Sequence, residues 1–316
     1  MRAISSHTHL HGPEEDTPVD PDKRSTLKKL AMLSLLFPFG RFSGRISRIA
    51  TANTGAVAPG EASMRVINCH AHFHGPDEVE QKRALWDSLG YVKICMSFNN
   101  DEVLKLAKRY PDYIVPFYRL DLDREGPDSV EAAKEQGFRG LKLIGPRQPY
   151  SHELYFPTYE RAEALDMPAL IHTGYVAFRP GRGVRQENLR PIYLVTIASY
   201  FPKFRMVGAH LGNQWPMEAV EAMATCENVW YDMSGGTIRH YPASWFQWLF
   251  ARVKRNKTGQ PPEIDLDLVG KLVFGSDNPD DTMEFYGNFM ASLEIPAEVQ
   301  EKVYYSNAVR WLGSAR

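Results

Sequence analysis

The sequence predicts an α/β fold, a single-domain (β/α)8 TIM barrel that follows an N-terminal extension. Short apolar runs alternate with amphipathic helical patterns from residue 64 to the end of the chain, as expected for a barrel of about 250 residues. Several of these runs end in His, Lys or Asp, and the carboxyl ends of the strands are where such barrels carry their active sites. No comparable boundary interrupts 64–316, so we expect one domain there.

The expected strands are apolar and rich in β-branched or aromatic residues, with turn residues after them. They are 64–70 (MRVINCH), 91–98 (YVKICMSF), 113–120 (YIVPFYRL), 138–145 (FRGLKLIG), 168–174 (PALIHTG), 204–210 (FRMVGAH), 228–235 (NVWYDMSG) and 271–277 (KLVFGSD). Helical periodicity fills the intervals. The expected helices are 101–110, 129–136, 157–165, 191–201, 217–226 and 243–255.

Residues 1–63 differ from the rest. Residues 1–22 are polar and contain proline, which predicts disorder. A basic cluster, an apolar stretch of about ten residues and the pair Ala56-x-Ala58 resemble an export signal. The stretch 23–28 (KRSTLK) is only a loose match to a twin-arginine motif, and Met64 could itself begin the folded protein. The sequence therefore leaves export and a cytoplasmic location both open.

The pattern His-x-His-x-His-Gly-Pro occurs twice, at 7–13 and at 70–76. The first copy lies in the extension, where nothing holds its histidines in one geometry. The second copy follows an apolar strand, in which alternate side chains share a face, so His70 and His72 point the same way from a rigid support. We expect the second copy to carry the chemistry.

Composition excludes several classes of partner. A net charge of −1 gives no electrostatic reason for binding nucleic acid or an anionic membrane. No apolar run approaches the ~20 residues of a membrane-spanning helix. Three scattered cysteines make neither a disulfide framework nor a Cys-type zinc site. A small-molecule substrate is the remaining expectation, and the sequence leaves a homodimer open.

Closing the barrel brings the ends of the strands to one mouth. The polar residues expected there are His70, His72, Lys142, His172, His210 and Asp277. The expected strand 271–277 should lie beside the first, which places Asp277 next to the histidine pair. Neutral imidazoles and a carboxylate suit a borderline divalent ion such as Zn²⁺.

Seven segments, in order and spacing over 64–313, resemble the amidohydrolase superfamily. The resemblance is to its amidohydrolase-related branch, which also contains the aminocarboxymuconate-semialdehyde and resorcylate decarboxylases. The segments are VINCHAHFHG, GFRGLKLIGP, MPALIHTG, FPKFRMVGAHLGN, NVWYDMSG, LVFGSDNP and SNAVRWLG. One departure is Asn68, where the family usually has Asp, and we expect it to alter the support of the site rather than remove it.

The resemblance implies that His70, His72, His172 and Asp277 ligate one divalent metal ion, Zn²⁺ first and Mn²⁺ as the alternative, with His210 beside it. The catalytic residues would then be Asp277 and His210. Asp277 would accept a proton from metal-activated water, and His210 would polarise the substrate carbonyl.

Substrate contacts are expected from Lys142, Arg147, Tyr175 and Arg179, which lie in or after strands at the mouth. Guanidinium groups there suit a carboxylate, and Tyr175 suits a ring, so a small organic acid or carboxylated aromatic is the expected substrate. Each Arg could instead belong to a solvated basic loop. Lys142 could also become carboxylated and bridge a second ion, as in some relatives.

The first prediction for the reaction is metal-dependent hydrolysis. The same residues would serve a non-oxidative decarboxylase, in which the ion holds a carboxylate or hydroxyl and Asp277 or His210 protonates carbon. A metal-free lactonase, a variant found in this branch, and a barrel without turnover are further alternatives. The complete set of coordinating side chains argues against both.

Overall fold

The computed structural model describes residues 64–176, 184–235, 237–252, 261–278 and 281–315. Residues 1–63, with the first His-x-His copy and the export-like pattern, lie outside this part of the chain. Arg179, one of the expected substrate contacts, also lies outside it. The fold and the site below concern the described residues only.

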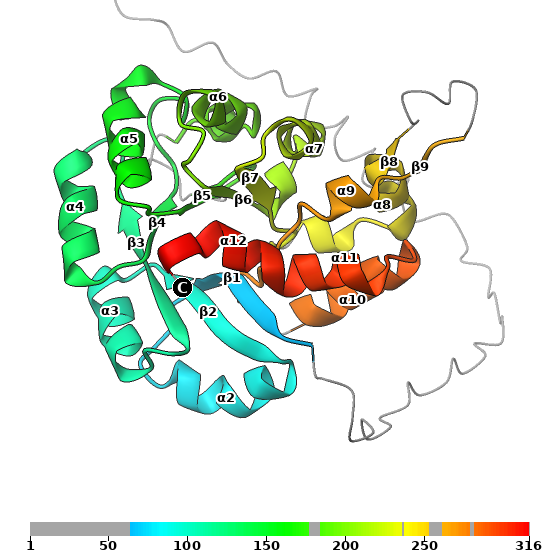
Figure 1. Cartoon of the computed structure of the whole chain (residues 1–316), viewed down its shortest axis with the longest axis horizontal. Helices are drawn as coiled ribbons and strands as arrows, with labels where there is room; N and C mark the ends of the chain where they lie inside the picture. Colours follow the sequence, from blue (N-terminus) through cyan, green and yellow to red (C-terminus); the bar gives the residue numbers. More distant parts are fainter. Residues whose placement is uncertain (1–63, 177–183, 236, 253–260, 279–280, 316) are drawn as a thin grey trace, which may run out of the picture. The chain divides into compact units, whose positions relative to one another are not determined.

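Seven parallel strands pair in sequence order to form a curved sheet, and the fold is the expected TIM barrel (Figure 1). The strands are β1 (Val66–His72), β2 (Tyr91–Ser97), β3 (Ile114–Leu120), β4 (Gly140–Leu143), β5 (Ala169–His172), β6 (Met206–Ala209) and β7 (Val229–Tyr231). Each lies within or overlaps one of the first seven expected strands, which are thereby confirmed. Most of their side chains are buried, in agreement with their largely apolar sequences, and the exceptions include Val92 in β2 and Arg119 in β3.

The expected eighth strand, 271–277, does not form a regular strand, although it fills the eighth position. Val273 N donates to Tyr231 O of β7 at 2.9 Å, and Cys69 N of β1 donates to Phe274 O at 2.9 Å. The ladder is interrupted because Phe274 N donates to Val303 O, outside the sheet, at 2.9 Å. The segment therefore closes the barrel between β7 and β1 with only a single bridge, between Tyr231 and Leu272.

Helices surround the strands in Figure 1, except the C-terminal helix, which lies across the ring of strands. They are α2 (Glu78–Ser88), α3 (Asn100–Arg109), α4 (Pro127–Gln136), α5 (Phe156–Ala164), α6 (Ile192–Tyr200), α7 (Pro216–Thr225), α8 (Ala243–Phe250), α9 (Leu266–Val269), α10 (Thr282–Ser292), α11 (Ala297–Glu301) and α12 (Asn307–Leu312). A π-helical turn (Lys302–Ser306) joins α11 to α12. Short 3-10 turns cover Glu153–Tyr155, Gln186–Leu189, His210–Gly212, Ile238–His240 and Gly313–Ala315.

The helix expected over 243–255 was predicted too long. It ends at Phe250, because Ala251 turns to an extended backbone and pairs with Ile264. The two short antiparallel strands are β8 (Ala251–Arg252) and β9 (Glu263–Ile264), which stand apart from the barrel sheet.

The C-terminal helix α12 closes the amino-terminal end of the barrel. The Trp311 ring stacks on Phe117 of β3 with ring centroids 5.1 Å apart, and both are fully buried. Arg205, which directly precedes β6, donates from Nε to Trp311 O at 2.7 Å. Because this end is filled, the opposite end, where the strands finish, is the one open to a ligand.

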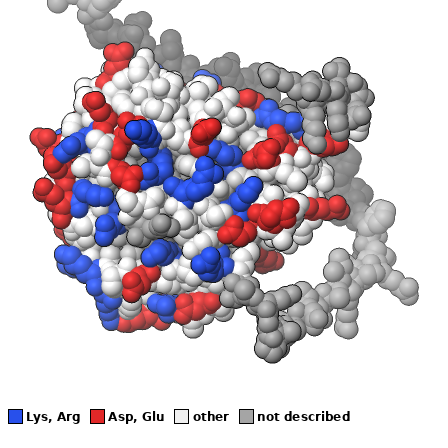
Figure 2. Space-filling view, in the orientation of Figure 1, with Lys and Arg blue, Asp and Glu red and all other residues white. Residues whose placement is uncertain are grey.

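The described residues contain no helix that is both long and apolar enough to cross a bilayer. On the face in Figure 2, basic and acidic side chains are interspersed rather than separated into one broad patch of a single sign. The expectation of a small-molecule partner stays a prediction.

Candidate active site

The expected polar residues do converge at the carboxyl ends of the strands. β1 carries His70 and ends at His72, β4 carries Lys142, and β5 ends at His172. His210 directly follows β6, and Asp277 ends the segment that closes the barrel. Six side chains separated by up to about two hundred residues thus meet in one cluster, joined by the contacts given below.

His70 is the fully buried centre of the cluster. Its Nδ1 lies 3.0 Å from Asp232 Oδ2, and its Nε2 lies 2.9 Å from Lys142 Nζ and 3.5 Å from Asp277 Oδ1. Since Asp232 is an acceptor, Nδ1 carries the proton, and Nε2 presents its lone pair to the cluster.

Asp277 contacts the second histidine of the pair. Its Oδ1 lies 2.9 Å from His72 Nε2, and its backbone N donates to His70 O at 2.8 Å. The backbone of Asp277 adopts a φ of 49°, a conformation that non-glycine residues rarely adopt. Asn68 supports this turn, because its side chain donates to Ser276 Oγ and accepts from Ser276 N, at 2.8 and 3.0 Å. The departure at Asn68 therefore falls on a residue that holds the Asp277 loop against β1.

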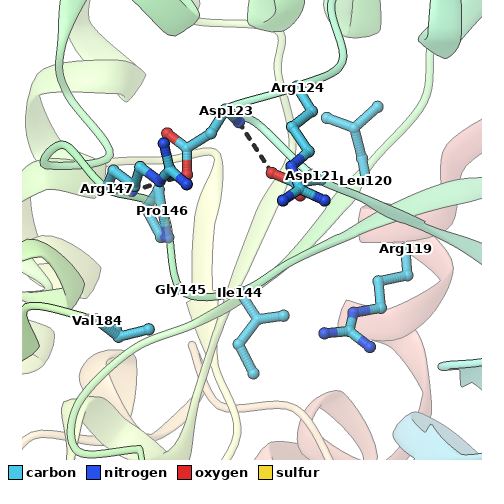
Figure 3. A pocket seen from close by; sticks show the side chains of 10 residues that line it. All are labelled: Arg119, Leu120, Asp121, Asp123, Arg124, Ile144, Gly145, Pro146, Arg147 and Val184. Carbon is cyan, nitrogen blue, oxygen red and sulfur yellow. Dashed lines mark hydrogen bonds and ion pairs between the residues drawn. The ribbon is translucent and has the colours of Figure 1, made fainter. Parts of the chain in front are cut away.

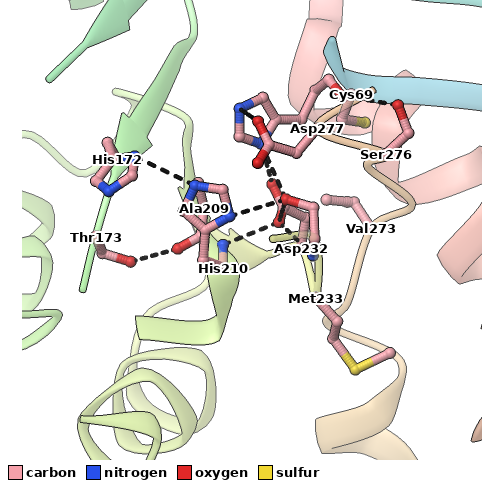
Figure 4. A network of polar contacts seen from close by, with 12 residues as sticks. Cys69, His172, Thr173, Ala209, His210, Asp232, Met233, Val273, Ser276 and Asp277 are labelled. Carbon is pink, nitrogen blue, oxygen red and sulfur yellow. Dashed lines mark hydrogen bonds and ion pairs between the residues drawn. The ribbon is translucent and has the colours of Figure 1, made fainter. Parts of the chain in front are cut away.

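His210 and His172 face each other on neighbouring strands. His210 Nε2 lies 3.2 Å from His172 Nδ1, and Figure 4 shows this pair continuing to Asp232. His210 also has a positive φ, of 65°. Glycine is required opposite it, because a Cβ on Gly235, which has a φ of 92°, would lie 2.7 Å from His210 Nδ1.

Two residues of the cluster were not predicted from the sequence, Asp232 and Ser234. Asp232 is fully buried after β7, and its Oδ1 accepts from His210 N at 2.9 Å, from Ser234 N at 2.9 Å and from Ser234 Oγ at 2.6 Å. The available signal was the segment NVWYDMSG, in which Asp232 directly follows the apolar run, as polar residues do in the other segments that supply the site. That segment was used to predict a strand, and the Asp that follows the apolar run was not considered as a site residue.

Ser234 fixes the proton positions of the histidines. Its hydroxyl donates to Asp232, so Oγ is left to accept from a ring N–H, and His210 Nδ1 lies 3.0 Å away. We therefore assign the proton of His210 to Nδ1, which makes Nε2 an acceptor for His172. The predicted role of His210 as a donor to a carbonyl oxygen stays a prediction, and it would require His210 to gain a proton first.

The electrostatics of the cluster favour neutral imidazoles and ionised carboxylates. Burial lowers the pKa of His72 to about 3 and that of His210 to about 4, and it lowers the pKa of His172. Burial alone would raise the pKa of Asp277, but the hydrogen bond from His72, together with the electrostatic influence of the surrounding histidines, holds it well below its usual range. Burial also lowers the pKa of Lys142, to about 8.

These donors fit a divalent cation. One ligand atom from each of His70, His210 and Asp277 lies within 4.8 Å of the other two. Neutral imidazole nitrogen and carboxylate oxygen are the usual ligands of Zn²⁺ and related ions, and an imidazole held by a carboxylate, as His70 is by Asp232, is the usual supporting arrangement. His72 and His172, expected as ligands, each touch one member of this trio. Which of the five would bind the ion stays a prediction.

A cavity of about 450 Å³ opens over the cluster. His72, His172, His210 and Asp277 form its polar wall, and Phe98, Ile144, Tyr175 and Ile238 contribute apolar surface. Of the expected substrate contacts, Tyr175 lines this cavity and is exposed. Lys142 is buried beneath it, and Arg147 lines a neighbouring cavity (Figure 3).

Solved structures of similar fold come from several bacteria. An uncharacterized TIM-barrel protein from Bordetella bronchiseptica is 16% identical with a TM-score of 0.57, over 79% of this chain and 99% of that one. A dihydroxybenzoic acid decarboxylase from Polaromonas, with bound manganese and the inhibitor 2-nitroresorcinol, is 15% identical with a TM-score of 0.55, over 80% of this chain and 98% of that one. A 5-carboxyvanillate decarboxylase from Sphingomonas paucimobilis is 13% identical with a TM-score of 0.54, over 79% of this chain and 99% of that one.

The comparison with curated proteins finds no match. The family model described as amidohydrolase matches residues 78–314, which is well over half of the sequence. This match begins after β1, so the His70 and His72 pair lies outside the matched residues. The chain therefore belongs to the amidohydrolase family.

Proposed function

We propose that the chain is a metal-dependent hydrolase that acts on a small organic acid or carboxylated aromatic. One observation carries the proposal: Asp277 Oδ1 lies against both histidines of β1, while its side chain remains 26% exposed in the wall of the cavity. A carboxylate in this position can take part in holding a cation and can also reach water in the cavity.

Under this proposal, His70 and Asp277 hold the ion, since they belong both to the ligand set implied by the resemblance and to the trio whose donor atoms lie within 4.8 Å of one another. The remaining ligands come from His72, His172 and His210. When bound, a divalent cation such as Zn²⁺ acidifies water and polarises a carbonyl group.

The protein's own residues supply the proton transfers. Asp277 is ionised at neutral pH, so it accepts a proton from the attacking water and returns it to the leaving group. Lys142 Nζ lies 2.9 Å from His70 Nε2, beneath the cavity, and keeps a positive charge near the carboxylate. Because Nε2 has a single lone pair, Lys142 would give up this contact when His70 holds the ion. Phe98, Ile144 and Tyr175 give the substrate an apolar surface on which a ring or planar chain can lie.

The test is turnover by the Zn²⁺-loaded full chain on a panel of lactones, amides and carboxylated phenols, with Asp277→Asn as the comparison. We expect hydrolysis that is lost on chelation, restored by Zn²⁺, and reduced at least about a hundredfold in Asp277→Asn. Hydrolysis that survives chelation would favour the metal-free lactonase. No hydrolysis of any ester or amide on the panel would contradict the proposal.

Decarboxylation is the second candidate, supported by the dihydroxybenzoic acid and 5-carboxyvanillate decarboxylases that share the fold. The same panel separates the two reactions, because a decarboxylase releases CO₂ from a carboxylated phenol and leaves lactones intact.

A further inference from the structure

The cavity over the cluster has a neighbour that the mechanism does not use. This second cavity, of about 460 Å³, lies at the ends of β3 and β4. Ile144 lines both cavities, so the two meet at this side chain (Figure 3). A substrate bound at the cluster and extending past Ile144 would therefore reach the second cavity.

Arg119 is held firmly at this junction. It lies near the end of β3, where its backbone N donates to Asn100 Oδ1 at 2.8 Å and its carbonyl accepts from Asn100 Nδ2 at 3.2 Å. Two hydrogen bonds from one side chain on α3 thus fix the backbone of Arg119. In Figure 3 its guanidinium lies on the side of Ile144, away from Asp121 and Asp123.

The charge of Arg119 is not neutralised by a carboxylate of the described residues. The Arg124 guanidinium of the same cavity differs, because it pairs with Asp121 at 3.7 Å. Arg147 is tied to Asp123 through its backbone N alone, and it lies on the far side of the cavity from Arg119 (Figure 3). Of these guanidinium groups, that of Arg119 is the one beside Ile144, where it is available to an anion that extends from the cluster.

Phe98 connects Arg119 to the cluster. The Arg119 guanidinium lies 4.7 Å from the centroid of the Phe98 ring, and that ring meets His72 edge-on with centroids 4.6 Å apart. Phe98 is 43% exposed and has a φ of 118°, an unfavourable conformation for a side chain of this size. A strained, exposed aromatic between a histidine of the cluster and an available guanidinium indicates a ligand contact rather than a packing role.

We propose that Arg119 and Phe98 form a specificity subsite that binds a second carboxylate of the substrate. The reacting group lies at the cluster, the planar body of the substrate lies on Phe98, and the carboxylate forms a two-point hydrogen bond with the Arg119 guanidinium. The subsite rests on the proposed function in using the same cavity, and it narrows the substrate to compounds that carry an anionic group besides the reacting one.

The test is calorimetric binding to the Zn²⁺-loaded full chain, which does not depend on turnover. The probes are benzoate and the three benzenedicarboxylates, whose different spacings sample the distance between cluster and subsite. We expect at least one dicarboxylate to bind about tenfold or more tightly than benzoate. Arg119→Met should reduce that ratio to about one, and Arg119→Lys should restore it only in part, because Lys lacks the planar fork.

The matched control is Arg124→Met, which removes a basic residue of the same cavity that is already paired. We expect it to leave the ratio unchanged. The subsite is wrong if the wild type shows no preference for any dicarboxylate, if Arg119→Met keeps the preference, or if Arg124→Met abolishes it equally. If the protein prefers a dicarboxylate but hydrolyses nothing, the proposed reaction is wrong and the subsite stands. If it hydrolyses a substrate but shows no preference for a dicarboxylate, the subsite is wrong and the proposed reaction stands.

Discussion

Replacing Asp232 by Asn tests whether this buried carboxylate keeps the proton of His70 on Nδ1, so that Nε2 can bind a cation. The amide keeps an oxygen for the three donors that Oδ1 now accepts, from His210 and Ser234. It places an NH₂ group opposite His70 Nδ1, where Oδ2 lies at 3.0 Å. His70 must then accept at Nδ1 and carry its proton on Nε2, the nitrogen that faces Lys142 and Asp277. The lone pair that would bind a cation is lost.

The magnitude follows from the bond that is changed. A hydrogen bond to a charged group contributes roughly 1.5–3 kcal/mol, and each 1.4 kcal/mol corresponds to about a tenfold change in affinity. We therefore expect Asp232→Asn to bind Zn²⁺ about 10- to 100-fold more weakly, in the range known for groups that support metal-binding histidines. The volume of the side chain hardly changes, so the fold should persist.

The assay is competition for Zn²⁺ between the protein and a chromophoric chelator near neutral pH, with denaturant unfolding in parallel. The control is Asn228→Ala, since Asn228 is buried before the same strand but donates only to the carbonyls of Phe201 and Phe204. It should lower the free energy of unfolding and leave Zn²⁺ affinity unchanged. A folded Asp232→Asn protein with wild-type affinity, or an equal loss in Asn228→Ala, would refute the reasoning.

Three other outcomes are expected. Trp311→Ala should lower the free energy of unfolding by roughly 3–5 kcal/mol in a denaturant titration, because it empties the closed end of the barrel; a loss below about 1 kcal/mol would contradict that packing. Gly235→Ala should reduce turnover at least about tenfold with little change in substrate binding, because the added Cβ displaces His210; normal kinetics would contradict the close contact. In chelated protein, the pKa of His210 is lowered to about 4, so the unfolded state binds this proton first between about pH 6.5 and 4. This group alone should lower the free energy of unfolding by roughly 3 kcal/mol as pH decreases, and His72 and His172 act in the same direction; a flat unfolding profile over that range would contradict it.

The sequence was sufficient for the barrel because its strands are largely apolar runs whose side chains are mostly buried. It was less informative where the hydrogen-bond pattern is set by distant residues. The segment 271–277 has a strand-like composition, yet Phe274 N donates to Val303 O of the C-terminal π-helical turn. No local sequence pattern predicts that partner. The end of α8 at Phe250 depends in the same way on pairing with β9.

The residues of the candidate site could be predicted where a polar residue ends an apolar strand. This reasoning located His70, His172 and Asp277, which the structure places in one cluster. It overlooked Asp232, whose importance comes from its contacts with His70 and Ser234 rather than from a recognisable motif. The positive φ angles of the site residues also follow from tertiary contacts and could not be inferred from residue type.

The central claim is that the cluster holds one divalent cation, and elemental analysis tests it most directly. The full chain would be reconstituted with Zn²⁺ or Mn²⁺ and dialysed, alongside His70→Ala and Asp277→Ala. We predict about one ion per chain in the wild type, and its loss in both variants while they remain folded. No retained ion in the wild type, or an equal content in the variants, would contradict the claim.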